Sequence, residues 1–490
     1  MNKSKRSILN AISAAILNFG NGLLSFVVTY LVINKFGSDF NGINSAANQI
    51  VSVLLIIEGG FTIATNVALF KPFAENDIKI FNSIVSATKI QFKKIGLFFF
   101  GLGIVVAFIY SILVQSIMDR SLIFTIVMMA IFPSAINLYF ATKYRILIQA
   151  EQKEYIISLV SIMTVFSGHL TNIALLHFFN INMVNIRFVT MIFSLLQSLL
   201  LMLYCKRTFL DVNFDEKPNF SLIKGTKDVF FLKITSAVYS TLPVLGISVI
   251  SENGAMLVSV YSIYNNVLLL IKSMLQSVMD GPRLSLGQVI AEGNKENTIK
   301  QFTLYEFITV VILVIFLSTV SAMIIPFVKW YSKDFSDINY INYYIAIILI
   351  LTTFFEIIHI PSGNYINMSG DFKKARSIQL MATIILVLGS VCLSFFMGIY
   401  GILLSVLLTA IYLCIREVFY IHYHVLKNMR IFLHISITNF IIFILTSLLW
   451  VNIFTTKDFM FIELFIYALY VFLSNIFVIF VWNYFFNKDY

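Results

Sequence analysis

The sequence predicts an all-α polytopic membrane protein in which fourteen spanning helices form two parallel six-helix repeats and a C-terminal pair. Of its 490 residues, 59 % are hydrophobic and 12 % are charged. Soluble proteins carry about 25 % charged residues, so this chain has roughly half the charge that a water-facing surface needs. The apolar residues form blocks long enough for the ~20 residues of a spanning helix. Short clusters of lysine and arginine separate these blocks.

The same composition excludes several classes of protein. Disordered chains have low hydrophobicity, and transmembrane β-barrel strands alternate apolar with polar residues, whereas Ile341 to Phe355 is continuously apolar. The cysteines are too few and scattered for a disulfide scaffold, and none lies near a histidine at zinc-site spacing. The net charge of +10 suits basic residues that face an anionic cytoplasmic leaflet, so it requires no nucleic-acid partner.

Fourteen apolar segments follow one another along the chain, with boundaries good to about four residues. The first is too long for a cleavable signal peptide and leads directly into the second. The second, fourth and tenth carry polar or helix-breaking residues within them. The predicted spans are 8–33, 42–68, 92–116, 121–148, 155–178, 183–204, 229–250, 255–280, 303–328, 340–366, 376–397, 399–424, 431–453 and 460–486.

Basic residues give the predicted orientation, because cytoplasmic loops carry an excess of lysine and arginine. With Lys3, Lys5 and Arg6 in the cytoplasm, an even number of spans returns Lys488 to the same side, so both termini are cytoplasmic. On this topology 27 basic residues lie inside, six lie outside, and Lys272 falls within a span. The six outside residues are Lys35, Arg120, Arg187, Lys329, Lys333 and Lys457.

A polar connection after the sixth span divides the chain and suggests an internal repeat. The predicted parts are a six-helix bundle at 1–204, a cytoplasmic linker at 205–228, a second six-helix bundle at 229–424 and an extra helix pair at 425–490. A shift of 217 residues places Ser45, Asn48 and Gln49 on Ser262, Asn265 and Asn266, and a shift of 220 places 149–153 on 369–373. Transporters with parallel halves bind substrate near the midplane and work by alternating access.

The segment from Phe36 to Gly42, the stretch from Ser45 to Gln49 and the run from Glu58 to Phe61 resemble a known family. They are similar to the polysaccharide transporter branch of the multidrug/oligosaccharidyl-lipid/polysaccharide exporter superfamily. The resemblance implies a flippase in the bacterial cytoplasmic (inner) membrane. Such a protein moves an undecaprenyl-diphosphate-linked O-antigen or capsule repeat unit from the cytoplasmic to the periplasmic leaflet. Its implied partners are this lipid-linked oligosaccharide, membrane lipids, a polysaccharide polymerase and a chain-length regulator.

Two charged residues fall mid-way in predicted spans, where a charge costs at least ~2.5–3.5 kcal/mol on insertion scales. Glu58 lies in the second span beside Gly59 and Gly60, and Lys272 lies in the eighth, the equivalent span of the other half. The functional interpretation makes Lys272 a contact for a diphosphate or an acidic sugar, with Glu58 as counter-ion or proton carrier. The structural interpretation is a salt bridge between Glu58 and Lys272 that only locks two helices.

A second candidate for ion coupling lies in the tenth span. Glu356 and His359 are three residues apart, on one helix face, with Pro361 and Gly363 just beyond. A carboxylate beside an imidazole can pass a proton near neutral pH. The alternative is a polar patch among lipid headgroups. Glu417, in the twelfth span, is expected to be an end-of-helix residue.

Four further residues are candidate substrate contacts. Arg283 follows Gly281-Pro282 at the inner end of the eighth span. A helix break there would expose backbone amides to a phosphate, although Arg283 can equally be a plain topogenic charge. The amides of Asn48, Asn265 and Asn266 can bond sugar hydroxyls or neighbouring helices.

No enzyme signature is present, and no cofactor or metal is expected. The chain has no Walker loop, nucleophile elbow or His-Glu-x-x-His helix. A membrane polymerase would need a large outside loop, whereas the longest here is near 329–339. A drug or cation exporter would use an acidic site in the first half, where only Glu58 is found. A lipid II flippase, the third alternative, would be rich in intramembrane arginines in that half.

Overall fold

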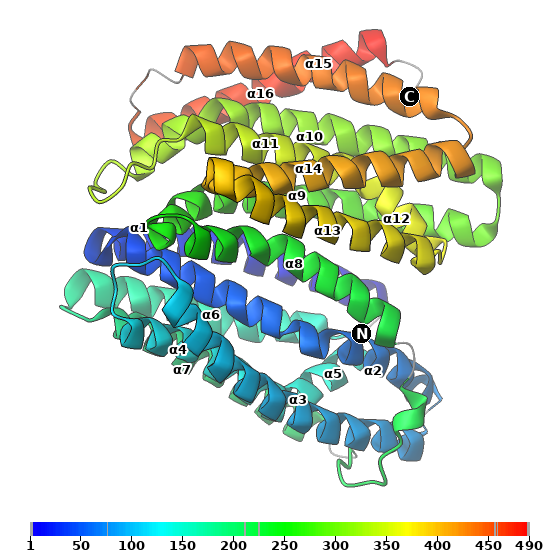
Figure 1. Cartoon of the computed structure of the whole chain (residues 1–490). Coiled ribbons are helices and arrows are strands. Elements are labelled where there is room, and N and C mark those ends of the chain that lie inside the picture. The colour runs from blue at the N-terminus through cyan, green and yellow to red at the C-terminus, as the bar shows by residue number, and fades with distance from the viewer. Residues whose placement is uncertain are drawn as a thin grey trace. The chain divides into compact units, whose positions relative to one another are not determined.

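The computed structural model of the chain describes residues 3–75, 77–209, 212–223, 226–454, 457 and 459–487, and these ranges are helical without a β-strand. Lys488 and Asp211 lie outside them. Contacts within the chain divide it into two compact units, Met1–Ser259 and Val260–Tyr490. Figure 1 labels the helices of both.

The first unit contains a bundle built around one long, interrupted helix. Gly37 interrupts α1 with φ 85° and ψ 171°, a conformation that glycine adopts without the steric cost of a Cβ. Helix α1 packs on α6, α3 on α4, α6 on α7, and α8 on both α1 and α2. The helices of this unit are α1 (Lys3–Leu54), α2 (Ile56–Ala74), α3 (Ile78–Leu113), α4 (Arg120–Ile136), η1 (Asn137–Ala141), α5 (Thr142–Ala150), α6 (Glu154–Phe178), α7 (Met183–Thr208), η2 (Phe220–Leu222), α8 (Thr226–Ile250) and the start of α9 (Gly254–Glu292).

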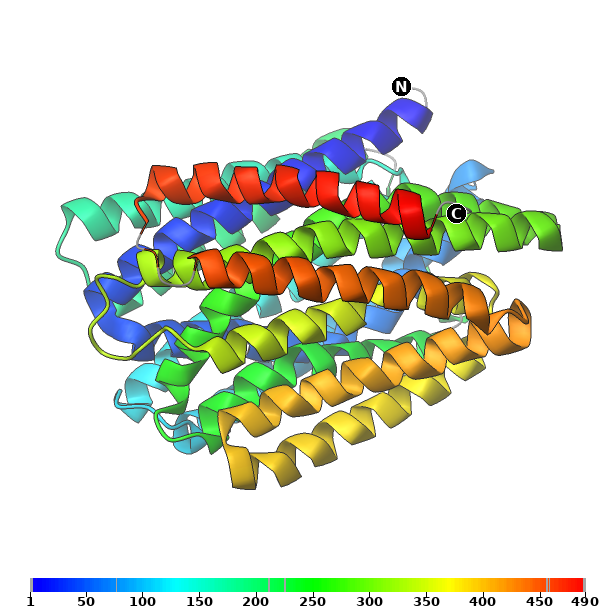
Figure 2. The ribbon, with the colours of Figure 1, turned by 90° about the horizontal axis from the view of Figure 1, so that it is seen from above.

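The second unit packs the last helix pair of the chain against α10. Figures 1 and 2 both show α15 and α16 beside α10. Helix α13 packs along α14, where a Cβ on Gly389 would lie 3.1 Å from the Ser405 Oγ, so a small residue allows the close approach. Besides the rest of α9, the helices are α10 (Lys295–Tyr331), α11 (Tyr343–Ile358), α12 (Ile360–Met368), α13 (Phe372–Met397), α14 (Ile399–Phe419), η3 (Tyr420–Val425), α15 (Met429–Phe454) and α16 (Phe461–Phe486).

Large apolar side chains cover outward-facing helix surfaces in both units. On α1, Ile8, Ile12, Ile16, Phe19 and Leu23 recur every three or four residues, and each is 40 % or more exposed. A soluble monomer rarely exposes so large an apolar stripe, whereas lipid tails cover it readily. Thirteen described helices or helix pairs are long and apolar enough to cross a membrane. The chain is therefore a multi-pass membrane protein.

The described residues contain thirteen candidate spans, one fewer than the fourteen predicted from the sequence. The first candidate, Ile8–Glu58, runs across the interruption at Gly37, so it includes the first predicted span and the start of the second. Every other predicted span lies on one helix or one interrupted pair, but three helices extend well beyond the predicted bounds: α3 begins at Ile78 instead of 92, α9 ends at Glu292 instead of 280, and α10 begins at Lys295 instead of 303. The expected break at Gly281-Pro282 is wrong, because α9 continues to Glu292. A proline removes only one backbone donor, and α9 extends beyond it on both sides.

Irregular backbone occurs at corresponding positions of the two predicted six-helix repeats. The fourth predicted span of each half is interrupted, by η1 at Asn137–Ala141 and by the break between α11 and α12 at His359. The break at His359 precedes Pro361, whose ring is incompatible with the preceding helical turn. Positive φ angles also recur at similar spacing, at Gly37 and Asn253 and at Gln152 and Gly370. The two spacings are 216 and 218 residues.

The connection after α7 lies against α3. The Lys89 Nζ is 2.6 Å from the Asp215 Oδ1, and the Asn213 backbone N–H donates to the Asn82 Oδ1 at 3.1 Å. The hydrogen bond and charge of Lys89 lower the pKa of the exposed Asp215 below its ordinary value. The described part of the predicted linker is therefore held against the N-terminal part of α3.

Candidate functional site

A small polar cavity of about 270 Å³ lies in the first unit, where two helices are interrupted. Its walls come from the start of α2, from η1 and from α5. Glu58, Asn137, Arg145 and Gln149 line it. η1 is a single π-helical turn between two α-helices, and such turns are frequent at functional sites. The side chain of Glu58 therefore borders a cavity inside the first unit.

The polar side chains of this cavity recur every helical turn. The Thr62 hydroxyl donates to the Glu58 Oε1 at 2.5 Å, and the Asn66 amide donates to the Gln149 Oε1 at 3.0 Å. Glu58, Thr62 and Asn66 are four residues apart along α2, so they share one face. Arg145 adds a positive charge to the same lining. A carboxylate with hydrogen-bond donors and a cation around it can gain and lose a proton or bind a small cation.

A buried arginine fixes Asn48, another predicted contact. Arg187 is only 5 % exposed, and its guanidinium donates to the Asn48 Oδ1 at 3.0 Å and to the Asn44 carbonyl at 2.6 Å. Asn48 itself is exposed. Arg187 is counted above among the outside basic residues although it lies inside the predicted span 183–204, and in the structure it is a buried residue of the second turn of α7. The first unit therefore holds a buried cation that the sequence analysis missed.

Lys272 forms an ion pair with Glu356 in the second unit. Lys272 belongs to α9 and Glu356 to α11, and their side chains are 27 % and 18 % exposed. The sequence predicts Glu58 as the partner of Lys272, whereas the acidic partner that the structure gives Lys272 within the second unit is Glu356. Asn265 lies two turns before Lys272 on the same face of α9. Neither the Asn265 nor the Asn266 side chain makes a hydrogen bond within the described part of the chain.

His359 pairs with Glu417 rather than with Glu356. The His359 Nδ1 lies 2.8 Å from the Glu417 Oε2, and the Gln379 amide donates to the Glu417 Oε1 at 3.3 Å. Gly363 makes room for this carboxylate, because a Cβ there would lie 2.6 Å from the Glu417 Oε2. Glu417 was expected to be an end-of-helix residue, and its pairing with His359 was not predicted. Glu356 lies in α11, whereas His359 stands at the break between α11 and α12, so the single helix face predicted for the two residues is interrupted.

A second histidine–carboxylate pair is fully buried and was not expected from the sequence. The His422 Nε2 lies 2.9 Å from the Glu306 Oε1, and both side chains are 0 % exposed. The rings of Phe302 and Phe432 lie 5.6 and 5.3 Å from the His422 ring. Glu306 stands as a single carboxylate within a long apolar run, which is the signal that could have found it.

Arg283 pairs with a neighbour on its own helix. Its Nη2 lies 2.9 Å from the Asp280 Oδ1, one turn earlier in α9. Because α9 is unbroken there, no backbone amides are released beside Arg283. Among the described residues, no group of three His, Cys, Asp or Glu side chains is placed to hold a metal ion.

No sequence family and no curated protein matches the chain, but solved structures do. The lipid II flippase MurJ in an inward closed conformation matches with a TM-score of 0.69 and 14 % identity over 94 % of this chain and 97 % of that one. An inward-facing multidrug resistance MATE family transporter of the MOP superfamily matches with a TM-score of 0.66 and 12 % identity, over 82 % and 96 % of the two chains. This chain has the fold of MOP superfamily transporters.

A third solved structure also matches the fold over most of both chains. A MOP superfamily transporter from Pyrococcus furiosus matches with a TM-score of 0.54 and 12 % identity, over 85 % of this chain and 94 % of that one. At such identities the likeness concerns the fold alone. The charged side chains must therefore supply the argument for a substrate.

Proposed function

We propose that the protein is a flippase that moves a polyprenyl-diphosphate-linked oligosaccharide, an O-antigen or capsule repeat unit, from the cytoplasmic to the periplasmic leaflet of the bacterial inner membrane. The observation that carries the proposal is the Lys272–Glu356 ion pair on spanning helices of the second unit. A lysine held within a membrane span is costly without an anionic partner. A diphosphate can replace Glu356 as that partner when the lipid binds.

The proposed topology has fourteen spans with both termini in the cytoplasm. The interruption at Gly37 supports it, because dividing the first candidate span there raises thirteen to fourteen. The charge bias of the loops supports it as well. The recurring turns and helix breaks of the two units support the two-repeat organisation, with residues 425–490 as the extra pair.

Exchange of partners on Lys272 links binding to ion coupling. When a diphosphate binds the Lys272 ammonium, Glu356 loses its counter-charge. After the lipid leaves on the outside, Glu356 pairs with Lys272 again. A proton or sodium ion that enters from the outside onto Glu58, or onto Glu356 and His359, then changes the net charge of the empty site and favours its return to the inward-facing state, where the cation is released down its gradient. His359 with Glu417, and Glu58 in the first unit, are the other groups that can hold a coupling proton.

The membrane potential favours the outward step. The cell interior is negative, so outward movement of an anionic lipid gains up to ~2.3 kcal/mol per charge per 100 mV. No nucleotide-binding motif occurs in the sequence. The voltage and an ion gradient are then the energy sources available to the chain itself.

A lipid II flippase is the second candidate function. The likeness to MurJ over 94 % of this chain favours it, as does the buried Arg187 in the first unit. The two candidates share the diphosphate lipid and differ in the sugar. Arg187 is occupied with Asn44 and Asn48, so we assign it to positioning Asn48 and retain the repeat-unit flippase as the first candidate.

Deletion of the gene in its host separates the two. We expect surface polysaccharide to disappear while lipid-linked repeat units persist inside and cell-wall synthesis continues. Lysis with accumulated lipid II would favour the second candidate. Normal polysaccharide and normal growth, with new sensitivity to cationic drugs, would contradict both and favour a cation exporter.

A further inference from the structure

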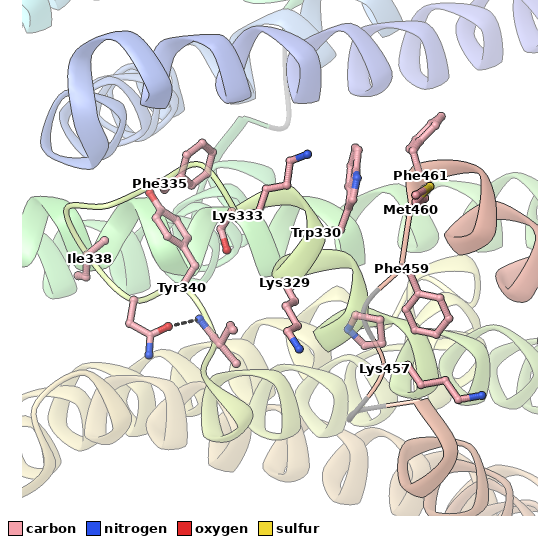
Figure 3. A pocket seen from close by; sticks show the side chains of 14 residues that line it. Lys329, Trp330, Lys333, Phe335, Ile338, Tyr340, Lys457, Phe459, Met460 and Phe461 are labelled. Atoms are coloured by element: carbon pink, nitrogen blue, oxygen red, sulfur yellow. Dashed lines mark hydrogen bonds between the residues drawn. The ribbon is translucent and has the colours of Figure 1, made fainter.

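A second pocket, of about 860 Å³, opens in the second unit away from the residues discussed above. Figure 3 shows it between the end of α10, the loop 332–342 and the segment that leads into α16. Its volume falls within the range typical of small-molecule sites. On the proposed topology both connecting segments lie on the periplasmic side.

The lining of this pocket is positively charged. Lys329, Lys333 and Lys457 contribute to it, and none of the described lining residues is acidic. Asp334 and Asp337 belong to the same loop but do not line the pocket. Periplasmic segments are depleted of lysine and arginine, yet three of the six basic residues predicted outside gather here. The rule that places lysine and arginine in cytoplasmic loops does not explain why three lysines line one pocket on the other side.

Aromatic rings form the walls and hold them in place. The rings of Trp330 and Phe461 lie 5.0 Å apart, and those of Phe335 and Tyr340 lie 5.1 Å apart. Tyr340 is 1 % exposed, and its carbonyl accepts a hydrogen bond from the Tyr264 hydroxyl at 2.8 Å. The pocket is therefore formed without a ligand, so little ordering opposes binding.

The loop itself is ordered by its own hydrogen bonds. The Ile341 backbone N–H donates to the Asn339 Oδ1 at 2.9 Å; this bond is drawn in Figure 3. The Asn342 backbone N–H donates to the Tyr264 hydroxyl oxygen at 2.9 Å. Tyr264 lies in α9, so a buried side chain of the bundle fixes the point where the loop enters α11.

We propose that this pocket binds the anionic, phosphate-bearing headgroup of a lipid in the outer leaflet. Lysine ammonium groups bind phosphate as mobile point charges, and charge-assisted hydrogen bonds of this kind are about twice as strong as neutral ones. Tryptophan and tyrosine concentrate at the level of lipid headgroups. The space exceeds what one phosphate ion needs and suits a headgroup with a glycerol or sugar attached.

The experiment measures lipid binding to the detergent-purified full chain by native mass spectrometry. The probes are undecaprenyl diphosphate, phosphatidylglycerol and the zwitterionic phosphatidylcholine. The test variant is Lys333→Gln with Lys457→Gln, whose side chains are both exposed, and thermal unfolding in detergent checks that the variant keeps its fold. The matched control is Lys35→Gln with Arg120→Gln, which removes two exposed outside charges remote in sequence from the pocket. Lys272 is intact in every variant.

We expect the pocket variant to bind an anionic probe about tenfold more weakly and the control to change less than about twofold, as removal of direct ion contacts predicts. Loss confined to undecaprenyl diphosphate identifies the lipid carrier as the ligand, and loss for phosphatidylglycerol as well identifies membrane phospholipid. Equal loss in variant and control, or equal loss for phosphatidylcholine, overturns the proposal. Binding is measured without transport, so this result is separate from the proposed flippase activity.

Discussion

Lys272 and Glu356 form an ion pair between α9 and α11, although 84 residues separate them in the sequence. Each side chain is about a quarter exposed or less. Breaking a buried pair by removing one partner destabilises a protein far more than removing both, because the remaining charge has no compensation. Lys272 and Glu356 are therefore best tested together.

Lys272→Ala should abolish export, and Lys272→Arg should retain part of it, because a diphosphate requires a cation at this position. The double variant Lys272→Ala with Glu356→Gln should restore thermal stability lost in Lys272→Ala without restoring transport. Membrane fractions and denaturation in detergent measure insertion and stability. Full export by Lys272→Ala would leave the ion pair a structural contact only.

Glu58→Gln should slow export and weaken its dependence on the ion gradient, because the variant cannot gain or lose a proton at that position. Glutamine preserves the acceptor for Thr62, so the cavity should keep its shape. Thr62→Val is the matched control, which removes the hydrogen bond but keeps the charge. Equal gradient dependence in wild type and Glu58→Gln would exclude Glu58 as the carrier, and Glu356→Gln would be examined next.

Gly42→Ala should destabilise the first unit. A Cβ on Gly42 would lie 1.7 Å from the carbonyl oxygen of Ala255, so the two backbones must separate, at about 1–3 kcal/mol for an overpacked contact. Gly101→Ala is the control, since nothing lies within 4 Å of its Cβ position. Thermal unfolding in detergent should show a lower midpoint for Gly42→Ala alone, and equal midpoints would contradict the contact.

Single cysteines should report the orientation of the helices. Cysteines placed at Lys35, Lys333 and Lys457 should react with an impermeant maleimide in intact cells, and cysteines at Lys71, Lys217 and Lys373 should react only after lysis. The native cysteines at 205, 392 and 414 are first replaced by serine. Reaction at Lys217 in intact cells would contradict a cytoplasmic linker and the fourteen-span topology.

The spanning helices could be predicted from the sequence because membrane insertion depends on local composition. Even the interrupted spans coincide with predicted ones, such as 340–366 with α11 and α12. Pro361 explains the break at His359, although Glu356 and His359 were predicted to share one unbroken helix face. At Gly281-Pro282 the same reasoning failed, because a proline permits a helix to continue when its neighbours tolerate one missing hydrogen bond.

The partners of the charged residues could not be predicted in the same way. His359 and Glu417 are 58 residues apart and Glu306 and His422 are 116 apart, so their meeting depends on how each helix is rotated against its neighbours. A single sequence contains little information about that rotation. Arg187 was counted as an outside charge because it lies near the start of a predicted span, and its position in the sequence does not show that its side chain is buried against Asn44 and Asn48.

Transport in proteoliposomes tests the proposed function most directly. Purified wild type and Lys272→Ala would be reconstituted with fluorescent undecaprenyl-diphosphate oligosaccharide, with lipid II or with a cationic dye, under imposed proton, sodium and voltage gradients. We predict that wild type moves the lipid-linked oligosaccharide faster under a gradient and that Lys272→Ala does not move it. Transport of the dye alone, or equal lipid movement in wild type, Lys272→Ala and protein-free vesicles, would contradict the proposed flippase.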